Sequence, residues 1–223
     1  MIKAVIFDLD NTIYDYDECN ANAIVELQRF AKKKYGLSEE SFMIFYDRAK
    51  KHVKNRLGNV GASHNRMLYM QRLLEELGEL PTKGALELYD VYWDNMLKNM
   101  HVFPYVRPLF KKLKERKICI AMLTDLTAHI QHRKIKVLGL EDDIQAFVSS
   151  EEAGKEKPAK EAFDSLKEKL ICSNKEMLMV GDSMLKDIEG AKKSGIEGIL
   201  FTKEHALDMD SIIMGYIDDF KDM

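Results

Sequence analysis

The sequence AVIFDLDNT, residues 4–12, decides the fold class of this chain. Its first four residues, Ala4–Phe7, form an uninterrupted apolar run, which is typical of a strand covered on both faces. Two acids, Asp8 and Asp10, follow this run directly. Because open α/β sheets bind ligands beyond the carboxyl ends of their strands, both acids stand where a ligand site is expected.

Five further apolar runs predict more strands of this kind. They lie at 118–123, 146–148, 177–180, 198–201 and, most weakly, 214–217. Amphipathic stretches of helical period separate the runs. Helices are expected from Pro108, over 130–138, from Pro158 and over 184–194. This alternation predicts an α/β fold, in which a parallel, Rossmann-like sheet is flanked by helices on both faces.

Residues 15–100 interrupt the alternation, because they contain no convincing strand. Glycine-containing breaks divide them into four helical stretches: 17–35, 38–57, 64–78 and 82–99. We therefore expect two domains. An α/β core domain is made of residues 1–14 and 101–223, and an all-helical domain, residues 15–100, is inserted after the first strand.

Asp8 and Asp10 are the first candidate catalytic residues. Two residues apart beyond a strand, their side chains leave on the same side. One carboxylate can attack an electrophile, as in aspartyl-phosphate formation, while the other exchanges a proton with the leaving oxygen. A solvated turn is one alternative, since Asp favours turns. A calcium loop is another, but its sixth and twelfth positions would be Ile13 and Cys19 instead of Gly and Glu.

Two further polar segments stand at predicted element ends. Thr124 and Asp125 end the 118–123 run, where a hydroxyl and a backbone N–H can hold phosphate oxygens. Lys157 precedes Pro158 at a helix start, where a lysine becomes favourable beside a bound anion. Taken singly, a helix cap at Thr124 and a solvated charge run around Lys157 are the simpler explanations.

Asp182 and Asp187 belong to the sequence GDSMLKD, which follows the 177–180 run. Mg²⁺ prefers one or two carboxylates together with substrate phosphate and water. A helix cap would explain Asp187 well and Asp182 poorly. All four segments fall at one edge of the predicted sheet. Together they supply a nucleophile, a proton donor, a cationic group and a metal site, which are the parts that phosphoryl transfer requires.

Four segments, in this order, resemble the motifs of the haloacid dehalogenase-like hydrolase superfamily: FDLDNT, LTD, KP and GDSMLKDIEGAKKSG. The resemblance covers residues 2–201, and the fourth segment is the most specific. The position of the helical insertion is similar to that of members with a C1-type helical cap. Residues 15–100 are therefore expected to form the cap domain.

The resemblance implies how the phosphoryl group is handled. Asp8 would be the nucleophile and Asp10 the general acid and base. Thr124 and Lys157 would bind the transferring phosphoryl group. Asp125 is grouped with these phosphate-binding residues, although many members have Asn at this position. Its carboxylate would repel a second anion or bond a substrate hydroxyl.

The resemblance also implies a magnesium site, held by Asp8, the main-chain carbonyl of Asp10 and Asp182, with Asp187 in support. The expected function is a magnesium-dependent phosphatase that hydrolyses a sugar phosphate or nucleotide through an aspartyl-phosphate intermediate. A phosphomutase of the same superfamily and a non-catalytic protein that binds a phosphate ligand remain alternatives. Carbon–halogen hydrolysis is disfavoured, since a departing halide needs neither an acid nor magnesium.

The composition restricts partners and location. The 223 residues carry a formal net charge of −3, so neither nucleic acid nor a membrane surface is expected as partner. The partner that the resemblance implies is a small-molecule phosphate ester. No run of about 18 apolar residues occurs, and no transmembrane helix is expected. Three dispersed cysteines without a CxxC pair fit a reducing compartment, which makes a cytoplasmic location the expectation.

Overall fold

The computed structural model describes residues 1–220 of the chain. The chain forms two compact units. The first unit consists of Met1–Asp15 together with His101–Met223, and the second unit is Tyr16–Met100. The second unit is therefore inserted into the sequence of the first, just after its N-terminal segment.

A five-stranded parallel sheet forms the centre of the first unit. Its strands are β1 (Ala4–Phe7), β2 (Cys119–Thr124), β3 (Ala146–Ser149), β4 (Met177–Gly181) and β5 (Glu197–Leu200), in the spatial order β3-β2-β1-β4-β5. Phe7 at the end of β1 is in register with Met122 of β2 and Val180 of β4. Because the strands are parallel, the residues that follow β1, β2 and β4 all emerge at one edge of the sheet.

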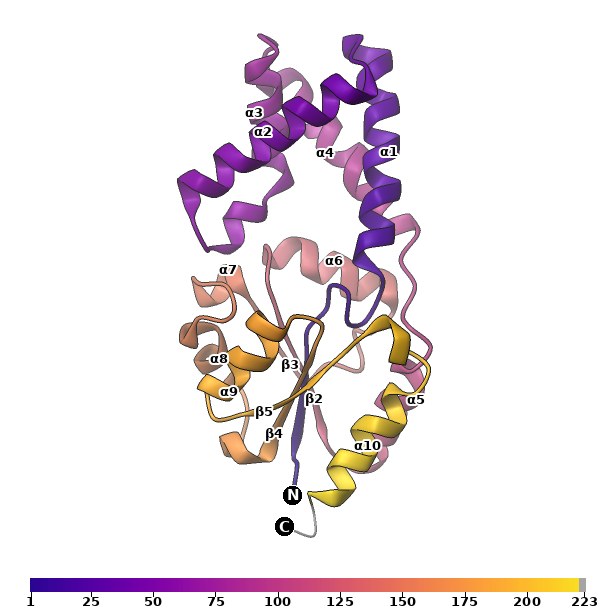
Figure 1. Ribbon diagram of the computed structural model, residues 1–223, viewed down its shortest axis with the longest axis vertical. Coiled ribbons are helices and arrows are strands. Elements are labelled where there is room, and N and C mark those ends of the chain that lie inside the picture. The colour runs from indigo at the N-terminus through magenta and orange to yellow at the C-terminus, as the bar shows by residue number, and fades with distance from the viewer. Residues whose placement is uncertain (221–223) are drawn as a thin grey trace. The chain divides into compact units, whose positions relative to one another are not determined.

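Helices flank this sheet. They are α5 (Val106–Glu115), α6 (Ala128–Leu138), α7 (Ser150–Ala153), α8 (Lys160–Lys167), α9 (Glu189–Lys193) and α10 (Met209–Asp219). Shorter turns are η2 (Asn174–Glu176), η4 (Lys203–His205) and the π-helical turn η3 (Met184–Ile188). Figure 1 shows α8 and α9 on one side of the sheet and α5 and α10 on the other. The predicted α/β class with a parallel, helix-flanked sheet is confirmed.

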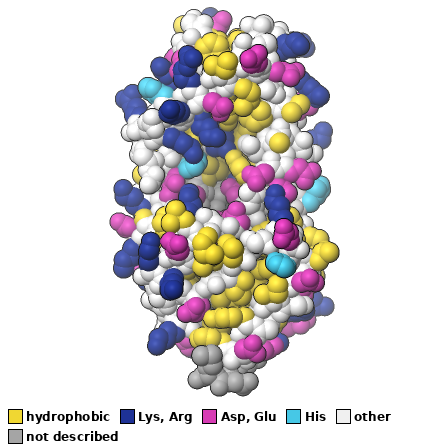
Figure 2. Space-filling model, in the orientation of Figure 1, with side chains coloured by type: hydrophobic (Ala, Val, Ile, Leu, Met, Phe, Trp, Pro, Cys, Tyr) yellow, Lys and Arg dark blue, Asp and Glu magenta, His cyan; other side chains and the backbone are white. Residues whose placement is uncertain are grey.

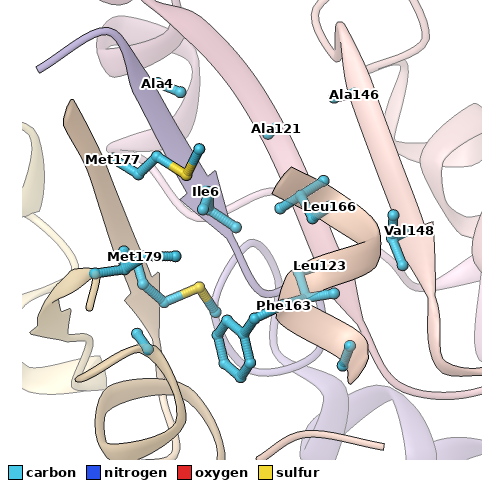
Figure 3. Packing of buried hydrophobic residues seen from close by; sticks show 13 residues of the cluster. Ala4, Ile6, Ala121, Leu123, Ala146, Val148, Phe163, Leu166, Met177 and Met179 are labelled. Atoms are coloured by element: carbon cyan, nitrogen blue, oxygen red, sulfur yellow. The ribbon is translucent and has the colours of Figure 1, made fainter. Parts of the chain in front are cut away.

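Apolar side chains on both faces of the sheet hold these helices in place. On one face, Phe163 and Leu166 of α8 are 1% exposed and pack with Ile6 of β1 in a cluster that spans the strands (Figure 3). On the other face, the rings of Phe7 and Phe110 lie with their centroids 5.1 Å apart. Burial on both faces explains why β1 to β4 appear in the sequence as continuous apolar runs.

The second unit is helical. Its elements are α1 (Tyr16–Tyr35), α2 (Glu39–Leu57), the short η1 (Gly61–His64), α3 (Arg66–Glu76) and α4 (Pro81–Lys98). Gly84 brings α4 close to its neighbours, because a Cβ there would lie 2.3 Å from the hydroxyl oxygen of Tyr35 and 3.0 Å from Cδ1 of Leu74. Large apolar residues fill the interior of the bundle, and Trp93 is 1% exposed.

Three expectations about elements need correction. The sixth strand predicted at 214–217 is wrong, because these residues belong to α10. Ile213 and Ile217 are both fully buried, four residues apart on one helical face. The helix expected from Pro158 begins at Lys160, and the one expected over 184–194 is a π-helical turn followed by α9. A short apolar run does not by itself distinguish a strand from a buried helical segment.

Figure 2 shows basic and acidic side chains intermixed over the visible face of the described residues. Within residues 1–220, no helix combines the length and the apolar character needed to cross a bilayer.

Candidate active site

Three acids meet at the carboxyl edge of the sheet. Asp8 follows β1, Asp182 follows β4, and Asp187 lies in η3. One carboxylate oxygen of each lies within 4.8 Å of those of the other two. Asp8 and Asp187 are buried, whereas Asp182 is exposed. Carboxylates gathered this closely, with one of them open to solvent, form an oxygen-rich set of the kind that Mg²⁺ prefers.

Lys157 joins two of these acids. Its Nζ donates hydrogen bonds to Oδ1 of Asp8 at 2.6 Å and to Oδ1 of Asp187 at 2.5 Å, and the residue is 4% exposed. Burial alone would lower the pKa of Lys157, but the charges of Asp187 and Asp8 outweigh burial and raise it. The ammonium group is therefore held in its charged form within the acid cluster.

The acids in turn carry more negative charge than Lys157 balances. Burial raises the pKa of Asp8 well above its usual value, Lys157 opposes this rise, and repulsion by Asp187 and Asp10 adds to it. Desolvation, followed by repulsion from Asp187, raises the pKa of Asp182 to about 6. Three carboxylates against one ammonium group leave an excess of negative charge, which a bound cation would offset.

The local sequence explains how Asp187 reaches this cluster. Gly181 ends β4, and a Cβ there would lie only 2.3 Å from Cγ of Asp187, so a residue without a side chain is needed. Ser183 then donates its backbone N–H to Oδ2 of Asp187 at 2.9 Å. The backbone N–H of Asp187 donates to the carbonyl oxygen of Ser183, also at 2.9 Å. The turn η3 thus fixes the Asp187 carboxylate against the end of the strand.

Thr124, at the end of β2, is buried and has a hydrogen-bond partner that was not expected from the sequence. Nε2 of Gln131, in α6, donates to Oγ1 of Thr124 at 2.6 Å and to the carbonyl oxygen of Asp125 at 2.8 Å. Gln131 is itself fully buried. Oγ1 of Thr124 in turn donates to the carbonyl oxygen of Asp125, at the long distance of 3.4 Å.

Asp125 is engaged through both carboxylate oxygens. Oδ1 accepts the backbone N–H of Lys157 at 3.1 Å, and Oδ2 accepts Nζ of Lys186 at 2.7 Å. Lys186 also donates to Oε2 of Glu156 at 3.4 Å. These contacts connect the loop after β2 to the segment that carries Lys157 and to η3.

Asp10 has a separate set of partners. Nζ of Lys134, in α6, lies 2.7 Å from Oδ1 and 2.9 Å from Oδ2 of Asp10. The hydroxyl of Tyr14 donates to the same Oδ1 at 2.7 Å. Sequence patterns alone did not identify Lys134, although it stands beside Ile130 and Ile135 on the mainly apolar face of the predicted 130–138 helix. A lysine on the mainly apolar face of a predicted helix was the feature of the sequence that could have identified it.

Comparison with known proteins places the chain in a family. The model of the haloacid dehalogenase-like hydrolases matches residues 2–195. The chain is 40% identical to a ribulose-1,5-bisphosphate 5-phosphatase of Halopiger xanaduensis, over 93% of this chain and 88% of the relative. It is 30% identical to a glyceraldehyde 3-phosphate phosphatase of Methanopyrus kandleri, over 99% of this chain and 93% of the relative.

Solved structures show the same fold. The HAD-hydrolase YfnB of Bacillus subtilis, in a crystal form bound to magnesium, matches with a TM-score of 0.67 at 22% identity. The match covers 90% of this chain and 88% of that one. With relatives named as phosphatases, the expectation of a phosphoric monoester hydrolase is confirmed. The chain belongs to the haloacid dehalogenase-like hydrolase family.

Proposed function

We propose that the chain is a magnesium-dependent phosphatase that removes the phosphate from a terminal carbon of a small sugar phosphate, with Asp8 as the nucleophile. One observation carries the proposal. The Asp8 carboxylate is buried at the carboxyl edge of the sheet, bonded to Lys157 and within 4.8 Å of the other two acids of the cluster. A nucleophile, a fixed cation and metal ligands at one point are what phosphoryl transfer needs.

In the first step, a carboxylate oxygen of Asp8 attacks phosphorus in line with the leaving oxygen. The bond from phosphorus to the leaving oxygen breaks, and Asp10 gives that oxygen a proton. Lys157 and the Thr124 hydroxyl bind non-bridging oxygens of the phosphoryl group as it transfers. The products of this step are the sugar alcohol and an aspartyl phosphate on Asp8.

In the second step, Asp10, now ionised, takes a proton from a water molecule. The water oxygen attacks phosphorus, the bond to the Asp8 oxygen breaks, and inorganic phosphate leaves. Asp8 and Asp10 return to their starting forms. Asp125 contributes through the backbone N–H of Lys157 and through Lys186, since its oxygens are already engaged by these donors.

The donor set fits a divalent cation. Asp8, Asp182 and Asp187 offer three carboxylates with an excess of negative charge, and desolvation together with repulsion from Asp187 raises the pKa of Asp182 to about 6. Asp8 and Asp182 would hold Mg²⁺ together with the main-chain carbonyl of Asp10, and Asp187 would support them. When bound, Mg²⁺ neutralises charge on the phosphoryl group and on the nucleophile.

The names of the relatives support the substrate class. Position 5 of ribulose bisphosphate and position 3 of glyceraldehyde phosphate are both terminal carbons of small polyhydroxy carbonyl compounds. A phosphate on such a primary carbon has a poor leaving group, so an acid such as Asp10 has a clear task. We further propose that residues 15–100 form the cap domain and that residues 1–14 with 101–223 form the catalytic domain.

The test is phosphate release from a panel that includes ribulose 1,5-bisphosphate and glyceraldehyde 3-phosphate, with and without Mg²⁺, for wild type and Asp8→Asn. We expect Mg²⁺-dependent release by wild type and at least a 1000-fold loss in the variant. Acid quenching during turnover, followed by borohydride reduction, should convert Asp8 to homoserine. Activity that survives in Asp8→Asn would refute the nucleophile. Isomerised ester without free phosphate would identify a mutase, and binding without turnover a non-catalytic protein.

The proposed location is a reducing compartment, the cytoplasm. Among the described residues, no disulfide links Cys19, Cys119 and Cys172. Thiols that stay reduced are the rule where glutathione and thioredoxin act.

A further inference from the structure

Among residues 1–220, Lys134 is the most deeply buried cation whose position the proposed reaction does not explain. Its side chain has no exposed surface and lies on α6 beside the buried apolar residues Ile130, Ile135 and Leu138. A lysine loses considerable side-chain freedom on burial, and its charge loses the hydration that water supplies. Such a position is stable only where the ammonium group has strong partners.

One strong partner of Lys134 is the Asp10 carboxylate. Nζ of Lys134 reaches both of its oxygens, at 2.7 and 2.9 Å, and the ring of Tyr14 lies 5.8 Å from Nζ. The hydroxyl of Tyr14, another buried residue, donates to Oδ1 of Asp10. Asp10 keeps 28% of its side chain exposed, so the carboxylate faces solvent on one side and these two donors on the other.

The two carboxylate oxygens are therefore not equivalent. Oδ1 accepts hydrogen bonds from both Lys134 and Tyr14, whereas Oδ2 accepts one, from Lys134. A carboxylate oxygen has two lone pairs in the carboxylate plane, so Oδ2 retains one that neither donor uses. Contacts to both oxygens also prevent the carboxylate from rotating about its terminal bond. The donors select one oxygen and fix its direction.

We propose that Lys134, assisted by Tyr14, is a positioning residue that holds the Asp10 carboxylate so that Oδ2 exchanges the catalytic proton. This inference rests on the proposed role of Asp10 as general acid and base. Lys134 acts through Asp10, both of whose carboxylate oxygens it contacts. Displacing a catalytic group by about 1 Å lowers the rate by about a hundredfold, so an Asp10 side chain without these contacts would exchange the proton poorly.

The test compares two esters in wild type, Lys134→Met and Asp10→Asn. Glyceraldehyde 3-phosphate has an alkoxide leaving group that needs a proton, whereas the leaving group of p-nitrophenyl phosphate departs without one. The kcat/KM value for each ester reports the steps up to departure of the leaving group. For Lys134→Met we expect a loss of about 100-fold with glyceraldehyde 3-phosphate, mainly in kcat, and of less than 5-fold with p-nitrophenyl phosphate.

Asp10→Asn separates the two possible failures. If Asp10→Asn lowers kcat/KM equally for both esters, Asp10 is not the general acid, and the proposed function fails together with the inference. If Asp10→Asn is selective and Lys134→Met is not, only the inference fails. If Lys134 were merely structural, Lys134→Met would lower kcat/KM for both esters in parallel, and this result would also overturn the inference.

Two further variants complete the design. Tyr14→Phe removes a single hydrogen bond to Oδ1, and we expect the same selectivity with a loss of about 3- to 10-fold. Tyr14→Phe replaces Lys134→Met as the test if Lys134→Met does not fold. A ratio of kcat/KM for the two esters equal to that of wild type in Tyr14→Phe would then refute the inference. Lys112→Met is the matched control, because Lys112 pairs with Asp210 at 2.6 Å on the surface of the same unit. Its kcat/KM for both esters should equal that of wild type.

Discussion

Gly181→Ala is the most informative change for the organisation of the acid cluster. The added Cβ would lie 2.3 Å from Cγ and 2.4 Å from Oδ2 of Asp187. Ordinary contact begins about 1 Å further out, so the Asp187 carboxylate must move by about that distance. It would then lose its hydrogen bonds from Lys157 at 2.5 Å and from the backbone N–H of Ser183 at 2.9 Å.

The expected size of the effect follows from these contacts. Disrupting the partners of a buried carboxylate costs about 3–5 kcal/mol of unfolding free energy. Because Lys157 also bonds the nucleophile Asp8, its displacement should lower kcat/KM by about 100-fold or more. We expect a weaker response to Mg²⁺ as well, since Asp187 belongs to the acid cluster.

The assay is phosphate release at several Mg²⁺ concentrations, together with urea unfolding. Gly215→Ala is the matched control, because nothing lies within 4 Å of the position of its Cβ in α10. It should leave activity unchanged and stabilise the helix by about 0.5–1 kcal/mol. If Gly181→Ala keeps kcat/KM within threefold of wild type at every Mg²⁺ concentration, then the close approach of Gly181 and Asp187 is not what orders the site.

Three other predictions concern the metal, the core and the helical unit. The pKa of Asp182 is raised to about 6, so this acid takes up a proton as the pH falls through 6 and then binds cations less. The rise in Tm caused by Mg²⁺ should therefore be larger at pH 7.5 than at pH 5. Equal rises at the two pH values would contradict the assignment of Asp182 to the metal site. Phe163→Ala should cost about 3–5 kcal/mol in urea unfolding, whereas Leu207→Ala, at a residue 74% exposed, should cost almost nothing; equal losses would refute the packing of α8 on the sheet. Gly84→Ala should destabilise the helical unit by about 1–3 kcal/mol, because the new Cβ lies 2.3 Å from the hydroxyl oxygen of Tyr35, and a more stable variant would contradict that close approach.

Strands β1 to β4 could be predicted because both faces of the sheet are covered there, whereas the edge strand β5 is only half-buried. Each of the five runs differs from its strand by no more than one residue at either end, as with 118–123 against Cys119–Thr124. The run at 214–217 has the same apolar character but belongs to a helix that packs one face on α5. Four apolar residues carry too little periodicity to separate these cases.

The polar residues could be located from the sequence only where a strand end predicts their position. Asp8, Thr124 and Asp182 each stand at such an end, and parallel strands bring their ends to one edge. Lys134 stands in the second half of α6, and its contact with Asp10 depends on where this helix passes over the loop after β1. Helix placement is set by packing of the whole unit, so no local pattern predicts this pair.

The charged groups near the carboxyl edge of the sheet differ in how well they are balanced. Lys134 pairs with Asp10, and Lys186 contacts Asp125 and, at 3.4 Å, Glu156. Around Asp8, by contrast, three carboxylates face the single ammonium group of Lys157, which leaves two negative charges when all are ionised. A phosphate ester adds negative charge at the same point, and desolvation at buried Asp8 strengthens the repulsion. Binding such a substrate without a divalent cation would therefore oppose the field of the site, so the proposed magnesium dependence follows from the charge balance of these four residues.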